Sequence, residues 1–159
     1  MQSDNTTIER LRVSVEPILK NRPIRLAYVY GSVAEGNSTP LSDVDIALVA
    51  DDELTPLQQL RLGLRLETEL GEQTGVRKIE ARVINRASLS LRGQVACRGI
   101  LIYARDEASR VDFETKTRDA YFDYQPVARR LRQSFFNDLL ERGLHGQSGK
   151  SARHGDPPV

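Results

Sequence analysis

The sequence is poor in cysteine and lacks tryptophan. Its 159 residues include one cysteine, Cys97, and no tryptophan. A single cysteine cannot form a disulfide bond within the chain, which excludes the disulfide-stapled class of small secreted domains. The N-terminal segment MQSDNTTIERLR also lacks the apolar core of a secretion signal. We therefore expect a cytoplasmic protein.

Long apolar runs and an excess of charge are missing as well. No stretch approaches the roughly 18 consecutive apolar residues that a membrane-spanning helix needs. The formal net charge is +1, so the field of the whole molecule does not demand a nucleic-acid partner. We expect no membrane association and no direct nucleic-acid substrate.

Strand-like and helix-like segments alternate along the chain and predict an α/β (α+β) fold. Apolar runs predict strands at 24–30, 43–50, 76–84 and 100–103. Periodic apolar residues and capping signals predict helices at 6–20, 55–75, 87–98, 106–124 and 126–142. We expect a core at 1–105, C-terminal helices at 106–143 packed on that core in the same domain, and a disordered tail at 144–159.

The second of these helical segments, 55–75, begins with a strong signal. Thr55-Pro56-Leu57-Gln58 supplies an N-cap, a proline at the first helical position and a glutamine three residues after the cap. The leucines that follow predict an apolar face on this helix, made of Leu57, Leu60, Leu64 and Leu70.

Two aspartates, one residue apart, open the second predicted strand in the stretch YGSVAEGNSTPLSDVDIAL, residues 30–48. Side chains two apart on a strand point the same way, so Asp43 and Asp45 present two carboxylates on one face. Like charges about 5 Å apart repel by about 3 kcal/mol at an effective dielectric of 20. Mg²⁺, which prefers carboxylate and phosphate oxygens, would relieve that repulsion. An isolated Asp-x-Asp pair is more often part of a solvated strand face. The residues around it therefore decide whether it is a metal site.

Three neighbouring residues favour a metal site. Glu80 lies on the charged face of the third predicted strand and can supply a third carboxylate. Gly31 ends the first strand, where the missing side chain lets the backbone approach a phosphate, and the Ser32 hydroxyl can donate to phosphate oxygens. We predict a site for a nucleoside triphosphate, with the carboxylates on one face of the sheet and helices on the other.

Gly31-Ser32, ten intervening residues and Asp43-x-Asp45 resemble the signature of the DNA polymerase β-like nucleotidyltransferases. The stretch YGSVAEG…SDVDIALV is most similar to the minimal nucleotidyltransferases (MNT) encoded beside HEPN-domain toxins. Residues 79–106, and the helical part from Val111 to Gly143 with YFDYQP, also resemble the adenylyltransferase antitoxins of that family. The similarity covers roughly residues 8–143.

This resemblance implies a polymerase-β-like core with a small mixed sheet and a C-terminal helical extension. It implies that Gly31 and Ser32 hold the ATP phosphates, and that Asp43, Asp45 and Glu80 are the catalytic and magnesium-binding residues, with two Mg²⁺ ions. The activity would be transfer of AMP from ATP to a tyrosine of a cognate HEPN ribonuclease toxin. That modification would neutralise the toxin, with which the chain would form a hetero-oligomer.

Two other functions compete with this interpretation. One is an antitoxin that acts by binding alone and carries a vestigial metal site. The other is a nucleotidyltransferase of the aminoglycoside type, which modifies a small molecule. The aromatic residues leave two structures open, because six of the nine lie between positions 113 and 136. They are either buried between two packed helices or exposed as a partner surface.

Overall fold

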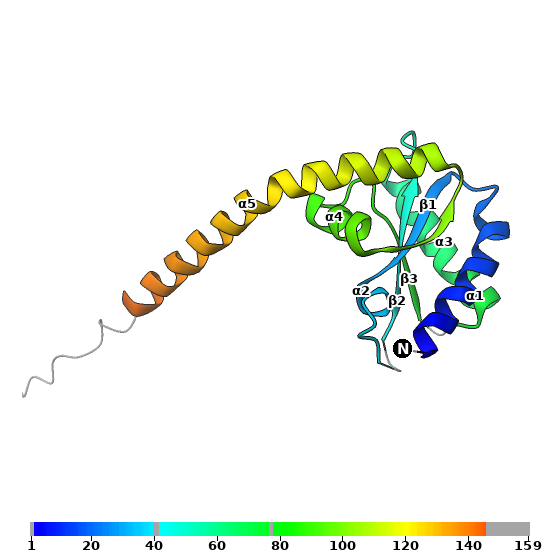
Figure 1. Cartoon of the computed structure of the whole chain (residues 1–159), viewed down its shortest axis with the longest axis horizontal. Coiled ribbons are helices and arrows are strands. Elements are labelled where there is room, and N and C mark those ends of the chain that lie inside the picture. Colours follow the sequence, from blue (N-terminus) through cyan, green and yellow to red (C-terminus); the bar gives the residue numbers. More distant parts are fainter. Residues whose placement is uncertain (1, 40–41, 77, 146–159) are drawn as a thin grey trace, which may run out of the picture. The chain divides into compact units, whose positions relative to one another are not determined.

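The computed structural model describes residues 2–39, 42–76 and 78–145, and contains a four-stranded sheet with helices around it (Figure 1). The described elements are, in chain order, α1 (Gln2–Leu19), β1 (Ile24–Tyr30), α2 (Gly31–Ala34), β2 (Val44–Ala50), α3 (Pro56–Thr74), β3 (Ile79–Val83), α4 (Leu89–Arg98), β4 (Ile100–Ala104) and α5 (Glu107–His145). No helix within the described residues has the length and apolar character needed to cross a membrane. The predicted tail falls mostly on residues 146–159, which lie outside the described part.

The strands form a mixed sheet in the order β3-β2-β1-β4. β1 pairs antiparallel with both β2 and β4, and β3 runs parallel to β2 at one edge. The prediction of a small mixed sheet is therefore confirmed. The parallel pair requires a crossover connection, which α3 provides between β2 and β3.

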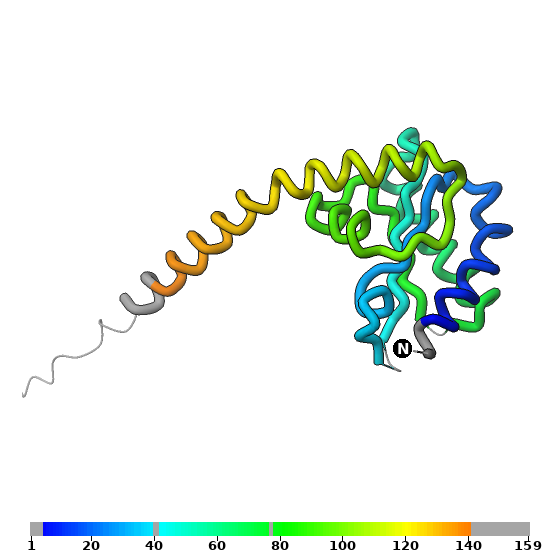
Figure 2. Tube along the Cα trace, in the orientation of Figure 1, coloured from blue at the N-terminus to red at the C-terminus, as the bar shows by residue number. Residues whose placement is uncertain are grey.

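Helices cover both faces of the sheet, and the expectation of helices on one face alone was wrong. On one face, α1 and α3 bury a large apolar cluster whose members include Leu11, Val29, Ile46 and Leu66. On the opposite face, Tyr28 and Val95 centre a smaller cluster to which α4 and α5 contribute. The trace in Figure 2 shows the first part of α5 passing beside α4.

A buried carboxylate explains why α5 packs on that second face. Glu114 accepts a hydrogen bond of 3.0 Å from the Tyr28 hydroxyl. Its other oxygen lies 3.1 Å from Arg110 and 3.2 Å from Arg118. Arg118 in turn donates to the Ala96 carbonyl of α4 at 2.8 Å. Two cations and a hydroxyl therefore satisfy a charge that would otherwise be costly to bury.

The start and end of α3 are those that the sequence predicts. Thr55 and Gln58 form the reciprocal capping box, and Gly75 closes the helix in a left-handed conformation. Of the four leucines predicted for the apolar face, however, only Leu70 is buried. Leu62, Leu66 and Leu70 are buried, whereas the stripe of Leu57, Leu60 and Leu64 is exposed. The helix carries two leucine stripes, and packing against β3 selects the one that also contains Gly63.

The C-terminal region is one helix, α5, and not the two predicted on either side of residue 125. Asp106 caps it as expected, because its carboxylate accepts the Ser109 backbone N–H at 2.7 Å. Pro126 lies inside the helix. Proline removes one helical hydrogen bond, yet the neighbouring residues, which include Ala128 and Leu131, are strong helix formers and the helix continues through it.

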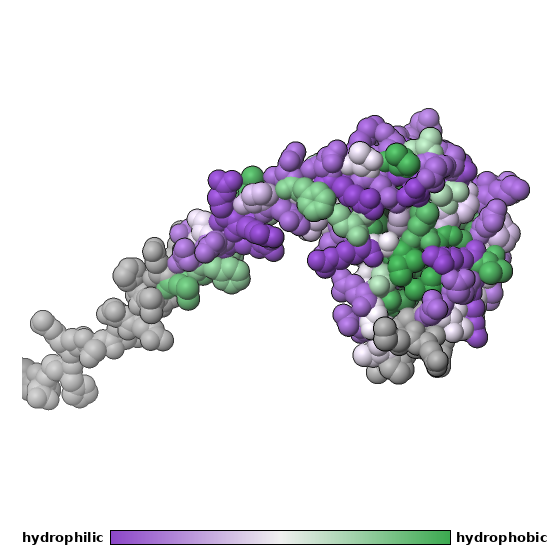
Figure 3. Space-filling view, viewed as in Figure 1, coloured by the Kyte–Doolittle hydropathy of each residue, from purple (hydrophilic) through white to green (hydrophobic). Residues whose placement is uncertain are grey.

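The chain divides into two compact units, residues 1–121 and 122–159. Residues 107–121 of α5 therefore belong to the same unit as the sheet. In the second unit, the described part of α5 carries several green, apolar patches (Figure 3). Its exposed large apolar side chains are Phe122, Tyr124, Val127, Leu131, Phe135, Phe136, Leu139 and Leu140. Four of the six aromatic residues between positions 113 and 136 are therefore exposed in this chain, whereas Phe113 packs against the cluster around Tyr28 and Tyr121 is partly buried.

We expect Gly93→Ala to destabilise the first unit by about 1–3 kcal/mol, because the Tyr121 side chain of α5 occupies the space that a methyl group on α4 would need there. A Cβ at Gly93 would lie 2.2 Å from the Tyr121 ring. The matched control is Gly71→Ala in α3, where the nearest atom to the added Cβ is 3.8 Å away. That substitution should be neutral or slightly stabilising, because alanine is the better helix former. Urea unfolding followed by circular dichroism measures both, and equal stability of the two variants would contradict the packing described here.

Candidate functional site

The parallel pairing of β2 and β3 brings two of the three predicted carboxylates together. Asp45 and Glu80 are direct partners in the register, and adjacent strands lie about 4.8 Å apart. Tyr30 is the partner of Asp45 on the other side, in β1. Asp43 stands immediately before β2, whose first residue, Val44, donates its backbone N–H to the Lys78 carbonyl. All three acidic residues therefore lie at the same end of β2.

Basic side chains from the β3 segment pair with two of these carboxylates. The Lys78 ammonium lies 3.3 Å from Asp43, and the Arg82 guanidinium donates to Glu80 at 2.9 Å. All four side chains are substantially exposed. Surface pairs of this kind stabilise a fold by less than about 1 kcal/mol, so a ligand can replace either partner at little cost.

Asp45 lies at the centre of the group and is the least exposed of the three. Partial burial is the main reason that the pKa of its carboxyl is raised above the ordinary value of 3.8. The negative charges of Glu80 and Asp43 raise this pKa further, and Arg82 opposes them. Both other carboxylates thus act on Asp45 through space, and the site has a deficit of positive charge around this residue.

Backbone conformation and the nearby Asp45 carboxylate together require glycine at position 31. Its φ of +69° lies in the left-handed region, and a Cβ built on it would stand 2.6 Å from the Asp45 Oδ2 atom. Only glycine satisfies both conditions without strain. Ser32 follows in the first turn of the four-residue helix α2. The Gly-Ser pair and the Asp-x-Asp pair, twelve residues apart in the sequence, are therefore in contact in the structure.

Residues 14–108, more than half of the chain, match the model of the family described as Polymerase beta, Nucleotidyltransferase. The chain belongs to this family. The match spans every residue of the site, from Tyr30 to Arg82. A search of the curated proteins gives no match.

Solved structures similar to this nucleotidyltransferase come from toxin–antitoxin complexes. A chain of the crystal structure of the toxin-antitoxin with AMP-PNP is 25% identical with a TM-score of 0.55, and the match covers 86% of this chain and 98% of that one. A chain of a MntA-HpeT toxin-antitoxin mutant is 26% identical with a TM-score of 0.54, covering 86% and 96%. A chain of the Shewanella oneidensis complex of tri-AMPylated HEPN toxin with MNT antitoxin is 21% identical with a TM-score of 0.57, covering 84% and 98%.

These similarities confirm the predicted fold class and the resemblance to the minimal nucleotidyltransferases of toxin–antitoxin pairs. The roles assigned to Gly31, Ser32, Asp43, Asp45 and Glu80 remain predictions for this member of the family. What the structure adds is their arrangement: Gly31 touches Asp45, Asp45 is paired with Glu80, and Asp43 is close enough to act on Asp45 electrostatically.

Tyr30 is a site residue that the sequence did not single out. Its ring is partly buried on the carboxylate face, beside its strand partner Asp45. Burial, followed by the charge of Asp45, raises the pKa of its hydroxyl above 10.0, so Tyr30 stays protonated at neutral pH and can donate a hydrogen bond. A signal was present, because strand alternation places residue 30 on the same face as Tyr28, opposite the side chain of Val29.

The donor set suits a magnesium ion. Within the described residues, no group of three or more His, Cys, Asp or Glu side chains is arranged to hold a metal ion, since Asp43 and Glu80 pair with Lys78 and Arg82 instead. The three side chains offer only carboxylate oxygens, which are the ligands that Mg²⁺ prefers. Burial raises the pKa of Asp45 most, and the negative charges of Glu80 and Asp43, which raise it further, would favour a cation beside it. The residues present therefore fit the ion that this fold implies.

The clustering of like charges should make Asp45 unfavourable for the stability of the metal-free protein. A carboxyl with a raised pKa in the folded state stabilises the fold while protonated, and that contribution is lost as the pH rises through the raised pKa. We expect Asp45→Asn to raise the melting temperature at pH 7 by about 2–4 °C, the response of a domain of this size to about 1 kcal/mol. Differential scanning fluorimetry in EDTA from pH 4 to pH 8 measures it. The gain should grow as the pH rises from 4, and a lower melting temperature at pH 7 would contradict the electrostatics described here.

Proposed function

We propose that this protein is a Mg²⁺-dependent adenylyltransferase that transfers AMP from ATP to a tyrosine of a HEPN ribonuclease toxin and so neutralises it. The observation that carries the proposal is the group of Asp43, Asp45 and Glu80 at one end of β2, in contact with Gly31 of the Gly-Ser turn. Three carboxylates beside a phosphate-binding turn are what nucleotidyl transfer requires.

In this proposal each residue has a separate task. Gly31 and Ser32 bind the β- and γ-phosphates through backbone N–H groups and the serine hydroxyl. Asp43, Asp45 and Glu80 would hold Mg²⁺, which when bound supplies the positive charge that stabilises the triphosphate. Lys78 and Arg82, released from Asp43 and Glu80, can turn toward phosphate oxygens. Tyr30 closes the side of the site next to Asp45 and excludes water from it.

The transfer itself exchanges one phosphorus–oxygen bond for another. The tyrosine hydroxyl of the acceptor protein attacks the α-phosphorus and forms a P–O bond, while the bond to the bridging oxygen breaks and pyrophosphate leaves. Glu80, the outermost of the three carboxylates, accepts the hydroxyl proton and passes it to solvent. The products are AMP-tyrosine on the acceptor and free pyrophosphate.

The choice of acceptor comes from the similar structures. One contains AMP-PNP, which is an analogue of ATP, together with a toxin and an antitoxin. Another contains a HEPN toxin that carries three AMP groups, in complex with an MNT antitoxin. We infer that this chain has the antitoxin role in a hetero-oligomer with a HEPN ribonuclease, and that ATP is its nucleotide substrate.

Intact-mass spectrometry tests this proposal. The purified chain is incubated with MgATP and its proposed partner, a HEPN ribonuclease, and the ribonuclease is weighed before and after. We expect a mass gain of one AMP or a small multiple, loss of ribonuclease activity, and no gain when EDTA replaces Mg²⁺. Neutralisation without a mass change would instead identify an antitoxin that acts by binding alone. Resistance to an aminoglycoside in cells that express the chain, with no effect on the ribonuclease, would identify a small-molecule nucleotidyltransferase.

A further inference from the structure

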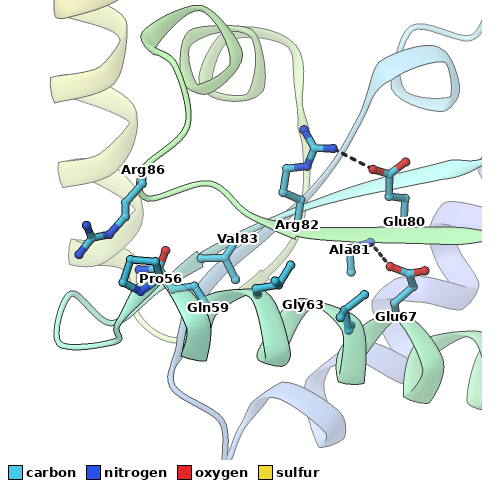
Figure 4. Close-up of a pocket in the computed structure, with 11 residues that line it drawn as sticks. Pro56, Gln59, Gly63, Glu67, Glu80, Ala81, Arg82, Val83 and Arg86 are labelled. Atoms are coloured by element: carbon cyan, nitrogen blue, oxygen red, sulfur yellow. Dashed lines mark hydrogen bonds and ion pairs between the residues drawn. The ribbon is translucent and has the colours of Figure 1, made fainter.

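A groove runs along the outer edge of the sheet, between β3 and α3 (Figure 4). It has a volume of about 340 Å³. Its floor is mostly apolar, and two arginines and two glutamates stand around it. The lining residues are Pro56, Gln59, Leu60, Gly63, Leu64, Glu67, Glu80, Ala81, Arg82, Val83 and Arg86.

The groove exists because β3 is an edge strand that α3 covers only in part. The Lys78 carbonyl and the Ile84 N–H both bond to β2, so the backbone groups of the odd-numbered residues between them point toward the open edge. Glu67 of α3 accepts the Ala81 N–H at 3.4 Å. A Cβ at Gly63 would lie 2.7 Å from the Ala81 carbonyl oxygen, so the helix approaches the strand closely at this position.

The helix wall of the groove presents side chains that the core does not use. Leu60 is 60% exposed and Leu64 is 56% exposed, in the stripe that the sequence suggested for the core. Arg86 is exposed at one end and has no ion-pair partner within the described residues. An apolar wall next to a basic group fits a peptide segment that carries an apolar side chain and a carboxylate.

The strand order separates this groove from the phosphate-binding turn. In the order β3-β2-β1, Gly31 and Ser32 follow β1 on one side of Asp45, whereas Glu80 and the groove lie on the other side. In-line transfer needs the attacking hydroxyl and the leaving pyrophosphate on opposite sides of the α-phosphorus. With the triphosphate at the Gly-Ser turn, the acceptor must therefore approach from the β3 edge, where Glu80 lines both the site and the groove.

We propose that the groove between α3 and β3 binds the segment of the acceptor protein next to the modified tyrosine. This inference rests on the proposed function, because it identifies the acceptor subsite of that same reaction. Leu60, Leu64 and Val83 bind an apolar side chain of the segment, and Arg86 binds an acidic one. Glu80 receives the tyrosine hydroxyl at the end of the groove that faces the nucleotide.

Two groove variants and one control test the subsite. Leu64→Glu places a charge on the apolar wall, and Arg86→Glu reverses the charge at the end. The control, Val13→Glu, changes an apolar residue of α1 that is 79% exposed and lines no part of the groove. Initial rates of AMP transfer are measured against the concentration of the HEPN ribonuclease, and AMP-PNP binding with Mg²⁺ is measured by calorimetry.

We expect each groove variant to raise KM for the ribonuclease at least tenfold, while AMP-PNP affinity stays within twofold of wild type and Val13→Glu changes neither quantity. Wild-type KM in both groove variants would overturn the subsite and leave the proposed function standing. Loss of AMP-PNP binding in both groove variants would also overturn it, because the groove would then serve the nucleotide. Absence of AMP transfer by the wild-type protein would overturn the proposed function, and the subsite with it.

Discussion

Asp45→Asn should lower the rate of AMP transfer by at least about 1,000-fold, a loss of about 4 kcal/mol of transition-state stabilisation. Asp45 is the central member of the carboxylate group, paired with Glu80 across the β2–β3 ladder and in contact with Gly31. Its charge is therefore needed both to hold Mg²⁺ and to keep the other two carboxylates acting on one point. Asparagine keeps the shape of the side chain and removes only the charge. The measurement is AMP incorporation into the HEPN ribonuclease by intact mass.

Asp119→Asn is the matched control, because it makes the same chemical change at an exposed position on α5. It should transfer AMP at the wild-type rate. Full activity in Asp45→Asn would contradict the assignment of the metal site. A combined result, in which Asp45→Asn melts higher in EDTA and yet transfers nothing, would show that this carboxylate is kept at a cost to stability. That outcome is the one expected of a functional charge that the fold itself does not need.

The sequence alone could propose the residues of this candidate site but could not predict how they are arranged. The spacing of Asp43 and Asp45 on a strand, and the position of Gly31 at the end of another, follow from local rules of strand alternation and backbone freedom. These rules hold within a single segment. The pairing of Asp45 with Glu80 depends on β3 lying parallel to β2, across a connection that contains all of α3. No local pattern specifies that register, so Glu80 could be proposed from its strand face but not located beside Asp45.

The predictions that were wrong share a cause. In α3, two leucine stripes satisfy the same helical period, and tertiary packing, which includes the close approach of Gly63 to Ala81, decides which one faces the sheet. In α5, the proline rule predicted a break, but helix propensity on both sides outweighs one lost hydrogen bond. The second helical layer depends on Glu114 and its contacts with Tyr28, 86 residues away in the sequence. Each outcome depends on tertiary contacts between distant parts of the sequence, and local sequence patterns do not reveal such contacts.

The exposed leucine stripe of α3 also bears on function. Leu57, Leu60 and Leu64 of α3 are exposed, so this helix carries more apolar side chains than it buries in the core. Solitary apolar residues on a surface need no explanation, but a stripe beside a groove that ends at Glu80 is a contiguous feature. The sequence pattern that gave the wrong core face therefore identifies a surface with another use, which the acceptor subsite supplies.

Gly31→Ala should lower AMP transfer by about 100-fold or more, whereas Gly36→Ala should leave the rate nearly unchanged. Both glycines have a left-handed φ, +69° and +71°, so alanine at either position carries a similar backbone strain of about 1–2 kcal/mol. Only at Gly31 would the new methyl group meet a site residue, since its Cβ would lie 2.6 Å from the Asp45 Oδ2 atom. At Gly36 no atom lies within 4 Å of the added Cβ.

The methyl group of the Gly31→Ala variant must displace the Asp45 carboxylate by about 1 Å. A shift of that size in a catalytic group can lower the rate about 100-fold. The Gly36 variant therefore controls for strain, and the difference between the two variants isolates the contact with Asp45. Thermal melting of both proteins, measured beside AMP transfer, checks that they fold alike. Equal loss of activity in the two variants would assign the glycine requirement to backbone conformation. Equal retention would mean that Asp45 does not need its observed position, and the site would then have to lie elsewhere on the sheet.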